Sequence, residues 1–177
     1  MTQTENRLER SDPDAYKAVI LARVGDRCPL EICSATPGAL EQIVGGHTVE
    51  ALRQRPDGKR WSALEVVGHL VDCEWVFGQR TRAIACDDRP AIIGIDQDLW
   101  VDTLKHQDRD PDDLVANFQA LRGINLETWR ALGDEHDHRV GLHNERGEES
   151  LGTMRMLIAG HDLHHLAQIE AILEADS

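Results

Sequence analysis

The stretch Leu151–Leu173, which reads LGTMRMLIAGHDLHHLAQIEAIL, decides how this chain folds. Read as a helix, it carries a stripe of side chains that recurs at steps of three and four residues, which is the pattern of a buried helical seam. The members of the stripe are Leu151, Met154, Ile158, His161, His165, Gln168 and Ile172. Apolar side chains fill both ends of the stripe, whereas two imidazoles and an amide occupy its middle. The stretch therefore predicts a helix packed against other helices, with polar groups inside the seam.

The polar groups in this seam need partners, because each buried polar group left unsatisfied costs about 1–3 kcal/mol. His161 and His165 are four residues apart, so they lie one turn from each other on the same face, where both could bind one metal ion. Hydrogen bonds to neighbouring helices are the alternative. This stretch alone does not separate the two interpretations.

The composition indicates one soluble domain. The chain has 177 residues, 41% hydrophobic and 29% charged, with a net charge of −13. This acidic balance disfavours binding to nucleic acid or to anionic lipid, both of which rely on an excess of Lys and Arg. The first residues lack the pattern of a signal peptide, and no apolar run reaches the roughly 20 residues needed to span a bilayer. We therefore expect a cytoplasmic protein whose four cysteines are reduced, because disulfides are rare without a secretion signal. None of the cysteines forms a Cys-x-x-Cys pair.

The order of the predicted elements follows from helix-start signals. Residues 1–14 are polar and are expected to be a flexible N-terminus, and residues 15–177 are expected to form the single domain. A short extra helix is expected between Ala15 and Ile32. Three longer helices precede the last one, and their predicted starts are Thr36-Pro37, the capping box Ser62-Ala63-Leu64-Glu65, and Asp110-Pro111. A long crossover after Cys86 would let the second and third long helices point the same way. The fold class is therefore all-α, a four-helix bundle.

A third imidazole, His69, lies on the predicted helix that begins at the capping box. It shares a face with Val66 and Cys73 and so points inward. If this helix neighbours the last one, His69, His161 and His165 form a three-histidine set for a divalent metal with positions left open. A core histidine bonded to protein is the alternative for each ring.

Several other residues are weaker candidates. Cys73 could be a fourth ligand, a nucleophile or an inert buried thiol. Asp72 and Asp162 are close enough in sequence to orient the imidazoles. Further candidates for ligand contact are Arg122 and Asn125, for which a surface ion pair and a hydrogen bond to a neighbouring helix are the alternatives.

The glycine-rich segment between the last two helices carries three more histidines. These are His136, His138 and His143, and their spacing fits no known ligand set, so a solvated loop is the favoured interpretation. Val140 and Leu142 alternate with other residues and hint at a short extended pair. The sequence has no His-Glu-x-x-His, Gly-x-Ser-x-Gly, P-loop or dinucleotide fingerprint.

Two segments together resemble a known family. They are Trp61–Glu74 (WSALEVVGHLVDCE) and His161–Ile169 (HDLHHLAQI), and with the spacing between them they are similar to the DinB-like superfamily of bacterial proteins. The resemblance extends over about Thr36 to Leu173. It implies an up-up-down-down four-helix bundle, frequent dimers, and a metal site of His69, His161 and His165 with zinc or nickel bound. His164 would be a neighbour that does not ligate.

The resemblance also implies a choice of functions. Members of the superfamily include bacillithiol S-transferases, mycothiol-dependent isomerases and suggested metal-dependent hydrolases. The leading hypothesis is a thiol-S-transferase in detoxification or stress response, in which the metal activates a low-molecular-weight thiol that attacks a small electrophile. A hydrolase using metal-bound water is the second hypothesis, and a metal-binding stress protein without turnover is the third. We expect a homodimer with one divalent metal per chain.

Overall fold

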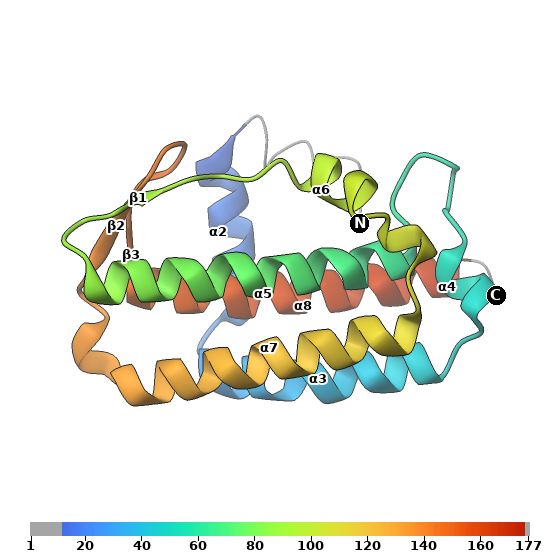
Figure 1. Ribbon diagram of the computed structural model, residues 1–177, viewed down its shortest axis with the longest axis horizontal. Helices are drawn as coiled ribbons and strands as arrows, with labels where there is room; N and C mark the ends of the chain where they lie inside the picture. Colours follow the sequence, from blue (N-terminus) through green and yellow to red (C-terminus); the bar gives the residue numbers. More distant parts are fainter. Residues whose placement is uncertain (1–11, 176–177) are drawn as a thin grey trace.

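Four long helices form the body of the computed structural model, which describes residues 12–175 (Figure 1). They are α3 (Pro29–Gly45), α5 (Ala63–Cys86), α7 (Pro111–Leu132) and α8 (Leu151–Glu174). α3 and α5 each pack against both α7 and α8. α3 and α5 therefore lie at opposite corners of the bundle, and α7 and α8 occupy the other two corners. The expected four-helix bundle is confirmed.

Shorter elements cover one side and both ends of the bundle. α2 (Pro13–Val24) packs on α8 and α4 (Val49–Arg53) on α5. The crossover from α5 to α7 contains β1 (Ala91–Ile92), α6 (Gln97–Thr103) and the 3-10 turn η1 (His106–Asp108). The connection from α7 to α8 contains η2 (Asp134–His136), β2 (Val140–His143) and β3 (Gly147–Ser150). β2 pairs in parallel with β1 and antiparallel with β3, so the extended pair expected near Val140 is part of a three-stranded sheet.

The expected N-terminal helix is present as α2, and it begins at Pro13. It therefore starts inside the segment 1–14 that was expected to be flexible. Residues 1–11 of that segment lie outside the described residues. Within residues 12–175, no helix combines the length and the apolar character that crossing a membrane would need.

The predicted starts of three long helices are confirmed by their caps. At α5, the Ser62 hydroxyl accepts the Glu65 amide at 3.2 Å while a Glu65 carboxylate oxygen accepts the Ser62 amide at 2.9 Å. Asp110 caps α7 and Ser150 caps α8 in the same way, with side-chain oxygens that accept amides of the first turn.

The predicted start of α3 at Thr36-Pro37 is wrong. α3 begins eight residues earlier, with Pro29 in its first turn, and Pro37 lies inside it. Pro37 has no N–H for the carbonyl of Cys33 one turn before it, which usually breaks a helix. Here Nη1 of Arg122 donates to that carbonyl at 2.9 Å. A contact from α7 thus replaces the missing helical hydrogen bond.

The directions of the four helices also differ from the expected order. β1 follows α5, β2 follows α7, and the two strands pair, so α5 and α7 end at the same end of the bundle. α8 starts at that end, directly after β3. In chain order the directions are up, down, down, up (Figure 1), not up-up-down-down. An up-up-down-down bundle needs two connections that run its whole length. This chain has one such connection, residues 87–110.

A polar layer separates two apolar clusters in the bundle. One cluster contains Leu64, Phe118 and Ile169, and the other contains Trp129, Met154 and Ile158. Between them lie buried charged side chains of α5, α7 and α8, including Arg122. The candidate site lies in this middle region, where α5 and α8 face each other.

Candidate metal centre

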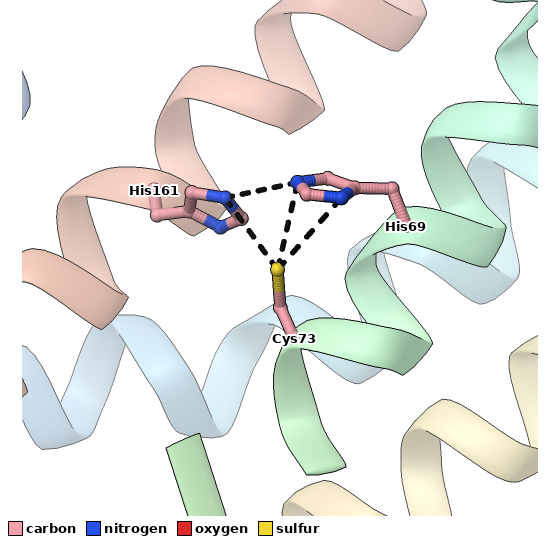
Figure 2. Close-up of side chains that lie close together, drawn as sticks. All are labelled: His69, Cys73 and His161. Carbon is pink, nitrogen blue, oxygen red and sulfur yellow. Dashed lines mark hydrogen bonds between the residues drawn. The ribbon is translucent and has the colours of Figure 1, made fainter. Parts of the chain in front are cut away.

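The rings of His69, His161 and His165 converge between α5 and α8. Nε2 of His161 lies 3.2 Å from Nε2 of His69 and 3.0 Å from Nε2 of His165, and all three side chains are buried. Figure 2 shows His69 on α5 and His161 on α8 pointing toward each other, with the sulfur of Cys73 below the line that joins the two rings. Helical spacing predicted that each ring faces inward, and the resemblance to the DinB-like superfamily implied that the three rings meet.

Hydrogen bonds among the rings do not satisfy these contacts. A nitrogen of a neutral imidazole has either one proton or one lone pair, so Nε2 of His161 can pair with only one of its two neighbours. Nδ1 of His165 lies 2.7 Å from Oε1 of Gln168 and donates to it, which leaves the lone pair on Nε2. Nδ1 of His161 is buried without a partner. One cation facing the three Nε2 atoms would satisfy them together, so the donor set fits a divalent transition metal.

Burial keeps the three rings in the form that binds metal. It lowers the pKa of His69 to about 3 and holds the pKa values of His161 and His165 well below the usual 6.5, and nearby imidazoles add to the effect. The pKa values of the three rings are lower in the folded state than in the unfolded chain. At acidic pH the folded metal-free protein therefore binds fewer protons than the unfolded chain. The free energy of unfolding of the metal-free protein is therefore unaffected by these rings above about pH 6.5 and falls as the pH drops from there toward 3.

The thiol of Cys73 lies next to the three-histidine cluster. Its Sγ lies 3.5 Å from Nε2 of His69 and 3.8 Å from Nε2 of His161. The ligand atoms of His69, Cys73 and His161 all lie within 4.8 Å of one another, a spacing that suits a shared metal ion. The sequence hypothesis that Cys73 is a fourth ligand therefore has a geometric basis.

His164 faces a different direction. Its ring is buried and meets the ring of Tyr16 on α2 edge-on, with 6.4 Å between the centroids. It also packs edge-on against His165, at 5.0 Å. His164 therefore lies on the side of α8 that packs against α2.

The expectation that Asp72 and Asp162 orient the imidazoles is wrong. Asp72 accepts a hydrogen bond from Nε2 of His106 at 2.7 Å, and Asp162 accepts one from Nη2 of Arg122 at 2.9 Å. Both carboxylates are engaged by buried donors on other elements, while Nδ1 of His161 has no partner and Nδ1 of His165 pairs with Gln168. Gln168 is the residue that orients a ring.

His106 is a buried residue that the sequence reasoning missed. It lies in η1 on the crossover, and its ring packs directly on Gly68 of α5. A Cβ at position 68 would lie 2.3 Å from that ring, so only glycine allows this contact. The glycine next to His69 was the one available signal that another group approaches α5 here.

Arg122 and Asn125 do not contact the candidate centre. Arg122 is 1% exposed and donates to Glu74 and to Asp162, so its interpretation as a surface ion pair is wrong. Nδ2 of Asn125 donates to a carboxylate oxygen of Glu74 at 3.0 Å, which matches the hydrogen bond between helices that was its alternative. Because Asp162 follows His161 directly, this network fixes the part of α8 that carries the centre.

The three histidines of the glycine-rich segment have different surroundings. His138 is exposed, and the His136 ring bonds to the carbonyl of Leu132. His143 is 4% exposed in β2, so the solvated-loop interpretation is wrong for this residue. The sheet that buries His143 is formed with a strand of the distant crossover, and the local sequence does not reveal that pairing.

A cavity of about 510 Å³ opens beside the three-histidine cluster. His69, Cys73 and His161 line it, together with Phe77 and Arg80 of α5 and His143 of β2. The cluster is thus accessible to a small molecule.

Gln168 offers a test of this geometry. Gln168→Ala removes the acceptor that holds the His165 ring, and we expect metal affinity to fall by about 10- to 100-fold, as for other residues that orient ligands. Competition with a chromogenic chelator measures it. Gln119→Ala, on the exposed face of α7, is the matched control and should leave affinity unchanged. Equal affinity in the two variants would mean that Gln168 does not act on the site.

Comparison with known proteins agrees with this architecture. The model of the DinB superfamily matches residues 33–169. The chain belongs to the DinB superfamily. The solved structure of YfiT from Bacillus subtilis, described as a probable metal-dependent hydrolase with an unusual four-helix bundle topology, is similar with a TM-score of 0.76 and 25% identity. The similarity covers 81% of this chain and 83% of that one.

Two curated relatives are also named as inferred metal-dependent hydrolases. The protein of Oceanobacillus iheyensis is 26% identical over 140 residues, which cover 75% of this chain and 79% of the relative. The protein of Geobacillus thermodenitrificans is 26% identical over 141 residues, which cover 77% of each chain. This member of the DinB superfamily thus carries its three-histidine cluster in a fold whose named relatives are linked to metal.

Proposed function

We propose that this chain is a metal-dependent enzyme whose metal is held by His69, His161 and His165, with zinc and nickel as the favoured metals. The observation that carries the proposal is the approach of three buried Nε2 atoms that hydrogen bonding alone cannot pair. When bound, a divalent cation lowers the pKa of a coordinated thiol or water toward neutrality and so supplies a nucleophile. The three neutral rings provide the ligands, and Gln168 holds one of them in orientation.

Within that class we propose a thiol-S-transferase that joins a low-molecular-weight thiol to a small electrophile. The carboxylates next to the site support this choice. Asp72, Glu74 and Asp162 are all engaged with His106 or Arg122, so none is free to act as a general base for water. A thiol needs less help, because its own pKa is close to neutrality. Detoxification or stress response is the setting we propose, in the cytoplasm.

Hydrolysis is the second candidate, and the names of the relatives favour it. It would use the same three ligands and the same cavity, with water in place of the thiol. The two candidates differ in one requirement, which is an added thiol.

One experiment separates these functions. The protein is loaded with zinc or nickel and incubated with a generic electrophile, such as a chlorodinitrobenzene, with and without cofactor thiols, and separately with a panel of esters and amides without thiol. Turnover that depends on a thiol and is lost in His69→Ala supports the transferase. Turnover of the panel without thiol, lost in the same variant, supports the hydrolase and overturns the transferase. Bound metal without turnover in either assay supports a metal-binding stress protein.

We further propose that the protein forms a homodimer. The exposed side chain of Trp75, at 65%, and those of Ile93 and Leu99 supply apolar surface outside the bundle core. Light scattering of the purified protein tests this, and a monomer mass at micromolar concentration would overturn it.

A further inference from the structure

Arg80 differs from the other buried arginines. Three arginines are buried in the described part of the chain, and two of them are paired with carboxylates: Arg122 with Glu74 and Asp162, and Arg155 with Asp134 and Asp137. Arg80 is 6% exposed, yet within residues 12–175 it forms no ion pair. Its Nη2 donates to the neutral carbonyl of Ile93 at 2.7 Å. A buried cation without a counter-ion is costly, so its presence on a cavity wall points to an anion that comes from outside the chain.

His143 gives a second, independent observation on the same cavity. Its Nδ1 accepts the backbone amide of Glu145 at 3.1 Å, so the proton of the neutral ring is on Nε2. That Nε2–H is buried and has no partner. Burial lowers the pKa of His143 to about 4, with the charges of Arg146 and Arg80 adding to the effect, so the ring is neutral at pH 7. The cavity wall thus carries one unpaired N–H donor and a guanidinium that has no ion pair.

The remaining charges around the cavity are already engaged or partly exposed. Arg146 makes two hydrogen bonds to the buried carboxylate of Glu149. Asp96 caps α6 through the amide of Leu99, and Lys17 and Glu145 lie at less buried positions. Solvent screens exposed charges far more than buried ones. The charges of Arg146 and Glu149 balance each other, and the carboxylate of Glu145 acts on Arg80 only from an exposed position. The buried charge that is left in the cavity is the positive charge of Arg80, which suits a monoanion.

The two ends of the cavity are linked by Phe77. Its ring centroid lies 5.9 Å from that of His161, and the guanidinium carbon of Arg80 lies 5.9 Å from the Phe77 centroid. A small molecule that spans Phe77 can reach both the three-histidine cluster and Arg80.

We propose that Arg80 and the Nε2–H of His143 bind a carboxylate, so that the cavity takes small organic carboxylates whose reacting part lies at the three-histidine end. The position of the reacting part rests on the proposed function. The carboxylate site itself does not, because Arg80 and His143 carry it without any metal. A planar monoanion with two oxygens matches one guanidinium and one N–H donor.

Calorimetric titration of the purified protein with benzoate and with benzamide, its neutral isostere, tests the proposal. A hydrogen bond to a charged group contributes about 1.5–3 kcal/mol, which is about 10- to 100-fold in affinity. We expect benzoate to bind at least about tenfold more tightly than benzamide. Arg80→Met should remove this preference and leave benzamide binding unchanged, and His143→Phe should weaken benzoate binding by a smaller factor. Arg82→Met, on the exposed side of the same helix, is the matched control and should bind benzoate like the parent.

Metal content is measured in every variant. A fall in benzoate affinity that follows a fall in metal content would indicate that benzoate binds to the metal and not to Arg80. Benzoate affinity that is equal in the parent and in Arg80→Met, or a preference for benzamide, overturns the proposal. If Arg80→Met fails to fold, Arg80→Lys and His143→Phe decide the question. Benzoate binding that is retained in Arg80→Lys and weakened in His143→Phe supports the site, and unchanged binding in His143→Phe overturns it. Binding that depends on Arg80 in a protein that shows no turnover would reject the proposed function and leave the carboxylate site standing.

Discussion

Purified His161→Ala and His165→Ala proteins will contain only traces of zinc or nickel, whereas the parent protein will contain close to one equivalent per chain. Each variant removes one of three converging Nε2 atoms, and the two that remain make a poor site for a divalent transition metal. Elemental analysis after overnight dialysis against metal-free buffer measures the loss. His69→Ala should behave the same way, because its ring completes the set from α5.

His164→Ala is the matched control for these variants. It removes a buried imidazole from the same turn of α8, but one that packs on Tyr16, so metal content should stay near that of the parent. Circular dichroism should show the same helix content in all four variants. Unchanged metal in His161→Ala contradicts the ligand assignment, and an equal loss in His164→Ala would mean that the wrong ring of the pair has been chosen.

Arg122→Met will cause the largest loss of stability of any single substitution considered. Arg122 is buried and neutralises Glu74 and Asp162, so its removal leaves two buried carboxylates without a counter-ion. Breaking a buried ion pair from one side costs about 3–5 kcal/mol. For a domain of this size, that is about 6–20 °C in Tm. Calorimetry or chemical denaturation followed by circular dichroism measures it.

Two further variants give this prediction its controls. Arg130→Met removes an exposed arginine from the same helix and should change stability by less than about 0.5 kcal/mol. Glu74→Gln and Asp162→Asn added to Arg122→Met remove the stranded charges and should restore part of the loss. A loss below about 1 kcal/mol in Arg122→Met would show that the network does not stabilise the bundle.

The imidazole cluster shows how far local pattern reaches in this protein. His161 and His165 share a face by helical spacing, and His69 lies inward on a helix whose start is marked by a capping box. Both facts are local, so the sequence predicted that the three rings face inward, whereas the meeting of the rings was implied by the family resemblance. In the structure, Nε2 of His161 lies 3.2 Å from Nε2 of His69 and 3.0 Å from Nε2 of His165. The starts of α5, α7 and α8 were predicted for the same reason, because a cap involves residues within one turn.

The partners of the buried charged groups could not be predicted in this way. Asp162 was expected to orient an imidazole and instead binds Arg122, and Asp72 binds His106 from the crossover. Thr36-Pro37 predicts a helix start, because a hydroxyl cap followed by proline is typical of a first turn. In the structure Pro37 lies inside α3, and Arg122 supplies the missing donor from another helix. His143 lies in a segment rich in glycine and polar residues, yet it is buried because β2 pairs with β1 of the crossover.

The sequence by itself determined the four long helices, the family, and the faces on which the three imidazoles lie, because helical periodicity and caps depend on residues within a few positions. The tertiary structure alone decided the order of helix directions, the role of each buried charge, and the cavity that joins Arg80 and His143 to the cluster. Those features depend on which elements lie side by side. A buried charge is stabilised by whichever partner the packing brings within hydrogen-bond distance, however far that partner lies along the chain.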